Sequence, residues 1–130
     1  MDSFYSSWTQ ESCENVDAFL GALKIGFLLR TAAKKQTPTM QFSAEGDEIT
    51  FKTITTFKTD EVKFRLGREF PEKRLDGIVV QTTAVIRDGV LIFHKQGDKP
   101  YTVTFTIEGD KLKATYTIGN VVATRTLKKD

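Results

Sequence analysis

One arginine near the end of the chain has the spacing of an inward-facing strand residue. Arg125 shares its phase with Ala123 and Leu127, whereas Thr124 and Lys128 take the opposite phase. A buried guanidinium without a partner costs several kcal/mol, and a carboxylate fits its fork of N–H donors. No Asp or Glu is obvious on the neighbouring inward faces. Spacing alone therefore leaves three interpretations open: a ligand carboxylate, a protein carboxylate, or a different strand phase.

Further polar residues fall on the faces that the pattern turns inward. Thr53, Thr55, Thr82 and Tyr116 alternate in phase with apolar neighbours. A barrel packed solid with side chains should avoid these residues, because buried polar groups need partners. A cavity that contains ordered water and a ligand can satisfy them. The Tyr116 hydroxyl could contact Arg125, cavity water or the ligand.

Residues for catalysis or metal binding are scarce. His94 is the only histidine, and no nucleophile motif accompanies it. A metal site would need more ligands, and no glycine-rich phosphate loop is present. Cys13 is the only cysteine, so no intramolecular disulfide can form and a reducing compartment is favoured. We interpret Cys13 as a small residue at a helix start or in the core, and we expect neither enzyme activity nor a cofactor.

The composition indicates one globular domain, residues 1–130. The formal net charge of +2, from 19 basic and 17 acidic residues, is too small to favour nucleic acid as the main partner. The first residues lack the pattern of a signal peptide, and no apolar run approaches the ~18 residues of a membrane span. We expect a soluble, cytoplasmic monomer and leave access to the nucleus open.

Two periodicities divide the chain. Asn15 can cap a helix that begins at Val16 and places Phe19, Leu20 and Leu23 on one face. A second short helix over 27–34 completes a helical hairpin. From residue 39 the alternation has period two and turn residues recur, which is typical of an antiparallel sandwich or an up-and-down barrel. The predicted strands or apolar rows are 39–44, 49–55, 62–66, 78–84, 90–96, 101–107, 112–118 and 121–127.

Several motifs resemble one family across essentially the whole chain. The segments 14–20, 55–59, 64–70 and 119–125 are similar to those of the intracellular lipid-binding proteins, which include the fatty-acid-binding and cellular retinoid-binding proteins. The resemblance implies a lipocalin-like (calycin), all-β fold: a ten-stranded antiparallel up-and-down β-barrel with a helix-turn-helix lid at about 16–35. It also implies reversible transport of long-chain fatty acids or similar lipids in an internal cavity, with a portal around Phe57.

The resemblance also places an aromatic group at the closed end of the barrel. Trp8 is expected to pack there with Phe4, Phe64 and Phe70.

The head-group site departs from the family pattern. Many fatty-acid-binding members have Arg-x-Tyr on the last strand and a second internal arginine, but here Leu127 and Phe105 stand at about those positions. Each buried ligand methylene contributes about 0.8 kcal/mol, so we predict that binding is kept and that head-group selectivity is relaxed. Two alternatives remain: a carrier of a retinoid, sterol or bile-acid-like ligand, and a peripheral membrane-bridging protein.

The expected ligand-binding residues combine the inward strand positions with the lid and portal. They are Arg125, Tyr116, Phe105, Leu127, Thr53, Thr55, Phe57, Met40, Leu20, Leu23, Ile25, Leu29, Pro38, Leu75 and Ala123. Several of the aliphatic ones could instead serve only lid packing.

The lid segment is basic. It carries Lys24, Arg30, Lys34 and Lys35, which form either a solvated face or a surface for transient contact with anionic membranes.

Overall fold

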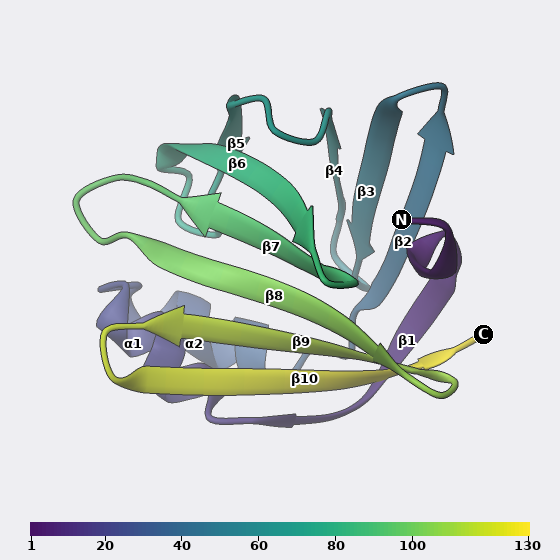
Figure 1. The fold of residues 1–130 in the computed structure, drawn as a ribbon. Coiled ribbons are helices and arrows are strands. Elements are labelled where there is room, and N and C mark those ends of the chain that lie inside the picture. The colour runs from purple at the N-terminus through teal and green to yellow at the C-terminus, as the bar shows by residue number, and fades with distance from the viewer.

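The computed structural model describes residues 1–130 and shows a nearly closed barrel of ten antiparallel strands with two short helices (Figure 1). The strands follow the order β4-β3-β2-β1-β10-β9-β8-β7-β6-β5. The first strand pairs with both the second and the last, which joins the two ends of the chain. The edges of the sheet are β4 and β5, and they form no ladder with each other. The strands are β1 Ser7–Glu14, β2 Thr39–Glu45, β3 Glu48–Ile54, β4 Thr59–Phe64, β5 Phe70–Lys73, β6 Val79–Arg87, β7 Val90–Lys95, β8 Tyr101–Glu108, β9 Lys111–Ile118 and β10 Val121–Lys129.

Two strands lie where residue spacing predicted none. In β1 only Trp8 is buried, and the pairing register with β10 shifts between Gln10 and Ser12, which breaks the period-two pattern. β5 is only four residues long and contains Pro71. The interpretation of Cys13 was wrong, because this residue is exposed on β1 rather than at a helix start or in the core.

Both helices lie where they were predicted. The first, α1, spans Val16–Ala22, and the second, α2, spans Phe27–Lys34. Asn15 precedes α1 in a left-handed conformation, with φ 63°, but its side chain does not cap the helix. Its amide Nδ2 instead donates to the carbonyl oxygen of Val122 at 2.9 Å, which fixes the start of the lid to β10.

A second, smaller core lies beneath the lid. Val16, Phe19 and Leu20 are the buried face of α1, and they form a cluster with Leu23 and Ala123. By contrast, α2 buries none of its residues. The lid is therefore held mainly through α1, which contacts both β9 and β10.

The larger core consists of inward-facing aromatic and aliphatic side chains from most strands. Phe4, Trp8, Phe64 and Phe70 all belong to this cluster. Ring-to-ring contacts run through this core from Phe64 to Phe93 and on to Phe105, which also contacts Phe42, with centroid distances of 5.2–5.6 Å. Neither α1 nor α2 has the length and apolar character of a membrane-spanning helix.

Candidate lipid-binding site

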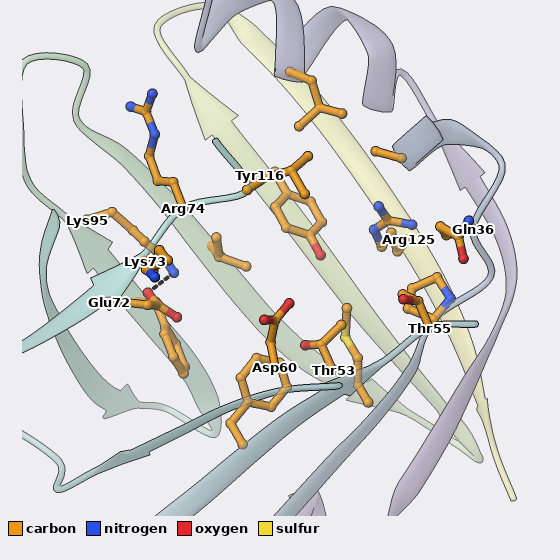
Figure 2. A pocket seen from close by; sticks show the side chains of 18 of the residues that line it. Gln36, Thr53, Thr55, Asp60, Glu72, Lys73, Arg74, Lys95, Tyr116 and Arg125 are labelled. Carbon is orange, nitrogen blue, oxygen red and sulfur yellow. Dashed lines mark hydrogen bonds and ion pairs between the residues drawn. The ribbon is translucent and has the colours of Figure 1, made fainter. Parts of the chain in front are cut away.

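The barrel encloses a cavity of about 510 Å³ beneath the lid (Figure 2). This volume is within the range of small-molecule sites, which run from roughly 300 to 1,000 Å³. The walls come from α1, α2 and the inward faces of most strands, and more than half of the 25 lining residues are hydrophobic. The cavity can therefore hold a largely apolar molecule.

Most of the residues expected from the sequence line this cavity. They are Arg125, Tyr116, Phe105, Thr53, Thr55, Phe57, Met40, Leu20, Leu29, Pro38 and Leu75.

The remaining expected residues lie in packed clusters and do not line the cavity. Leu23, Ile25 and Ala123 belong to the core beneath the lid, together with the buried residues of α1. Leu127 is completely buried in the larger core, opposite Leu112 of β9. Inward phase alone cannot distinguish a cavity wall from packed core, because both place a side chain on the same face of a strand.

Arg125 is inward-facing, as its phase predicted. It lies between buried Ala123 and Leu127 along β10. Its Nη1 donates to Oε1 of Gln10, and its guanidinium carbon lies 5.9 Å from the centroid of the Tyr116 ring. The protein partner of Arg125 is thus a neutral amide rather than a carboxylate. No protein carboxylate forms an ion pair with this guanidinium, so its positive charge remains uncompensated by protein.

Tyr116 lies beside Arg125 on β9, where it pairs with Ala123 of β10. Its ring packs against Phe19 of α1 at a centroid distance of 5.3 Å. Burial raises the pKa of the Tyr116 phenol, and the nearby charge of Arg125 opposes this rise. The hydroxyl is therefore neutral at physiological pH and available as a hydrogen-bond donor.

Residue spacing did not identify a second polar group on the opposite wall. Glu72 of β5, Lys95 of β7 and Tyr101 of β8 all line the cavity. Lys95 shares its phase with buried Leu91 and Phe93, so the alternation of this strand contained the signal. Burial, and secondly the charge of Glu72, raise the pKa of Tyr101.

Arg74 connects this wall to the lid. It is a lining residue whose guanidinium forms a double contact with the Asp76 carboxylate: Nε donates at 3.0 Å and Nη2 at 2.5 Å. Nη2 also donates to the carbonyl oxygen of Leu23, the C-cap residue of α1, at 3.4 Å. The hydrogen bond from Arg74 is the main cause of the lowered pKa of Asp76.

The contact between Arg74 and Asp76 predicts that the folded state is less stable in acid. The pKa of Asp76 is lower in the folded protein than its ordinary value of 3.8. The ionised carboxylate therefore adds to the free energy of unfolding above that value, and this contribution is lost as pH falls through the folded pKa. Urea titrations from neutral to strongly acidic pH measure the free energy of unfolding, which should decline less steeply with acidity in Asp76→Asn than in the parent chain. Exposed Asp88 offers a matched control, and Asp88→Asn should leave the decline unchanged. Equal declines for all three chains would contradict the prediction.

Residues on the α2 side and residues of the turn after β3 both line the cavity. Leu29 and Gln36 line it from the helical side, and Phe57, which is 78% exposed, lines it from the turn. A hydrogen bond of 3.1 Å from the Thr56 hydroxyl to Oε1 of Gln36 joins the two sides. The predicted portal would open between these two sides.

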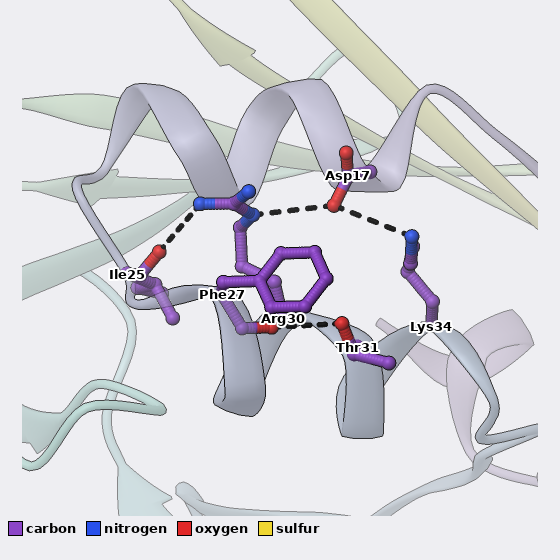
Figure 3. A network of polar contacts seen from close by, with 6 residues as sticks. All are labelled: Asp17, Ile25, Phe27, Arg30, Thr31 and Lys34. Atoms are coloured by element: carbon purple, nitrogen blue, oxygen red, sulfur yellow. Dashed lines mark hydrogen bonds and ion pairs between the residues drawn. The ribbon is translucent and has the colours of Figure 1, made fainter.

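Charged contacts stabilise the lid itself (Figure 3). Asp17 of α1 accepts from Nε of Arg30 at 3.2 Å and lies 3.7 Å from Nζ of Lys34. Arg30 also donates to the carbonyl oxygen of Ile25 at 3.0 Å. Two of the basic lid residues are therefore engaged in holding α2 against α1, which leaves Lys24 and Lys35 without an ion-pair partner.

A lidded β-barrel around a mainly apolar cavity, with one uncompensated guanidinium inside, is the architecture of a protein that binds amphipathic lipids. Residues 6–130 match the family described as "Lipocalin / cytosolic fatty-acid binding protein family". The chain belongs to this family.

Named relatives agree with this assignment. The chain is 36% identical over 131 residues to a "Fatty acid-binding protein" of Lepidoglyphus destructor, covering 99% of both chains. It is 39% identical over 124 residues to a "Fatty acid-binding protein" of Tyrophagus putrescentiae, covering 95% of both. Among solved structures, the Schistosoma mansoni fatty acid binding protein in complex with arachidonic acid is 30% identical, with a TM-score of 0.95 over 100% of this chain and 98% of that one.

Proposed function

We propose that this protein binds long-chain fatty acids non-covalently in its cavity and carries them through the cytoplasm. The observation that carries the proposal is Arg125, a cation inside a mainly apolar cavity whose protein partner is neutral. A carboxylate is the natural counter-ion of a buried guanidinium. Relatives named as fatty-acid-binding proteins, and the S. mansoni complex with arachidonic acid, support the same ligand class.

The apolar walls supply most of the binding free energy in this proposal. Each ligand methylene taken out of water contributes about 0.8 kcal/mol, so a long acyl chain contributes on the order of 10 kcal/mol before ordering costs. One hydrogen bond to a charged group contributes roughly 1.5–3 kcal/mol. Arg125 therefore chiefly selects the carboxylate and fixes its orientation.

Removal of the cation tests the proposal. Arg125→Leu should weaken oleate binding by about tenfold to a hundredfold, the equivalent of one charged hydrogen bond, while oleyl alcohol binds as before. Competition against a fluorescent fatty acid measures both ligands, and Arg87→Leu, at an exposed position on β6, is the matched control. Failure of oleate to displace the probe from the parent chain would overturn the proposal, and mass spectrometry of co-purified lipid would then reveal a retinoid, sterol or bile-acid-like ligand.

The surface of α2 supports a second proposal, that the lid makes transient contact with anionic membranes. Phe27 and Leu28 are 67% and 84% exposed, and Lys24 and Lys35 have no ion-pair partner. Exposed apolar side chains beside basic ones are typical of helices that bind at bilayer interfaces.

Transfer kinetics test the membrane contact. Leu28→Ser should slow transfer of a fluorescent fatty acid to anionic vesicles several-fold, because the apolar contact with the bilayer is lost. Val122→Ser, at an exposed apolar residue of β10, should leave the rate unchanged. Equal rates for the two variants would exclude a contact made through α2.

A further inference from the structure

A buried ion pair lies in the cavity wall opposite Arg125. Nζ of Lys95 donates to Oε1 of Glu72, and the side chains are only 11% and 16% exposed. The Thr82 hydroxyl, on the strand between them, donates to the same oxygen at 3.1 Å. The Lys95 ammonium also lies 5.4 Å from the Phe93 ring centroid and 5.8 Å from that of Tyr101. Four adjacent strands thus hold this pair in place.

The pair retains hydrogen-bonding capacity toward the cavity. An ammonium has three N–H donors, and only the contact to Glu72 uses one of them. Both protein donors go to Oε1 of Glu72, so Oε2 accepts from no protein group. Figure 2 shows both side chains at the cavity wall, well separated from Arg125. One donor-rich cation and one free acceptor therefore stand side by side at the surface of the cavity.

We infer that this pair is a subsite for an alcohol, and that the protein accepts hydroxylated fatty acids whose hydroxyl lies far from the carboxylate. This inference rests on the proposed function, which places the carboxylate at Arg125. A hydroxyl both donates and accepts, so it can donate to Oε2 of Glu72 and accept from Lys95 at once. A second carboxylate can only accept, and it meets the negative charge of Glu72.

The positions of the two polar groups suit a long ligand. Lys95 on β7 and Arg125 on β10 are three strands apart, which corresponds to roughly 14 Å around the wall at the usual strand spacing. The pairing registers of β7 to β10 place Lys95 at the same height in the barrel as Val121 of β10. Val121 is four residues before Arg125, which corresponds to roughly 13 Å along the strand. A long acyl chain can span such a separation with its two ends at the two polar groups.

Comparison of three acids tests the subsite. The parent chain should bind 16-hydroxyhexadecanoate at least as tightly as hexadecanoate, and hexadecanedioate more weakly than either. The double variant E72Q/K95M keeps side-chain volume and leaves no unpaired buried charge. It should weaken binding of 16-hydroxyhexadecanoate by about tenfold, the equivalent of a lost charged hydrogen bond, and leave hexadecanoate within about threefold. Titration calorimetry measures all three.

A matched control is available on the outer surface. Lys52 and Glu61 form an ion pair of the same types between β3 and β4, with side chains 42% and 45% exposed. K52M/E61Q should leave all three affinities unchanged. Two results would overturn the subsite while the proposed function stands, provided that hexadecanoate binds. One is that the parent chain binds the hydroxy acid more weakly than hexadecanoate. The other is that E72Q/K95M and K52M/E61Q bind the hydroxy acid equally well. If hexadecanoate itself fails to bind, the proposed function fails first.

Discussion

Gln10→Glu should lower the affinity for long-chain fatty acids by roughly a thousandfold. The amide oxygen of Gln10 accepts from Arg125, and a carboxylate in its place would neutralise the guanidinium from within the protein. An incoming fatty acid would then meet a like charge at about 4 Å, which costs about 4 kcal/mol at the effective dielectric constant of partly buried sites. Since about 1.4 kcal/mol corresponds to tenfold, this is the largest single effect on binding that we expect.

The measurement is competitive displacement of a fluorescent fatty acid by oleate and, separately, by oleyl alcohol. Only the acid should lose affinity, because the alcohol carries no charge to be repelled. Acidification that protonates the introduced carboxyl should recover part of the loss. Gln81→Glu adds the same charge at an exposed position on β6 and should change neither ligand. If oleate bound Gln10→Glu as tightly as the parent chain, Arg125 would not be the anchor of the carboxylate.

The partner of Arg125 also shows where sequence reasoning ends. The inward phase of Arg125 was predictable, because β10 alternates regularly. Gln10 was not, because the register shift between Gln10 and Ser12 interrupts the pattern of β1, and this strand has a single buried residue. A bulge changes which side chains face inward without leaving a periodic signal.

The opposite wall shows a different kind of limit. Lys95 follows Leu91 and Phe93 in phase, and its inward position could have been predicted from them. Glu72 lies on β5, a strand of four residues, which is too short for a reliable period. That the two side chains meet depends on the order β5-β6-β7 in the sheet, which is a tertiary property.

Cavity and core could not be separated by the same reasoning. Phe105 and Leu127 are both inward and both almost fully buried, yet only Phe105 borders the cavity. The difference depends on how completely the facing strands fill the space between them, and packing of this kind is decided by all walls of the barrel together.

Phe93→Ala should lower the free energy of unfolding by about 3–5 kcal/mol. Phe93 is 1% exposed, and its ring lies 5.2–6.5 Å from those of Phe51, Phe64, Phe70 and Phe105. Truncation would therefore remove contacts on several sides at once. Phe93 also borders the ligand cavity, so the vacated space would join that cavity instead of forming a closed void. Denaturant titration of the ligand-free protein measures the loss.

Ligand binding should separate this effect from ordinary core damage. Phe4→Ala removes an equally buried ring of the same cluster that does not line the cavity, and it should cost a similar free energy. A fatty acid that binds only the folded state, at 100 times its Kd, adds about 2.7 kcal/mol of stability. In Phe93→Ala, branched or longer acids should stabilise more than hexadecanoate does, because they fill the added space. In Phe4→Ala the order of the acids should match that of the parent chain. An unchanged order in both variants would show that the space left by Phe93 is closed off from the bound ligand.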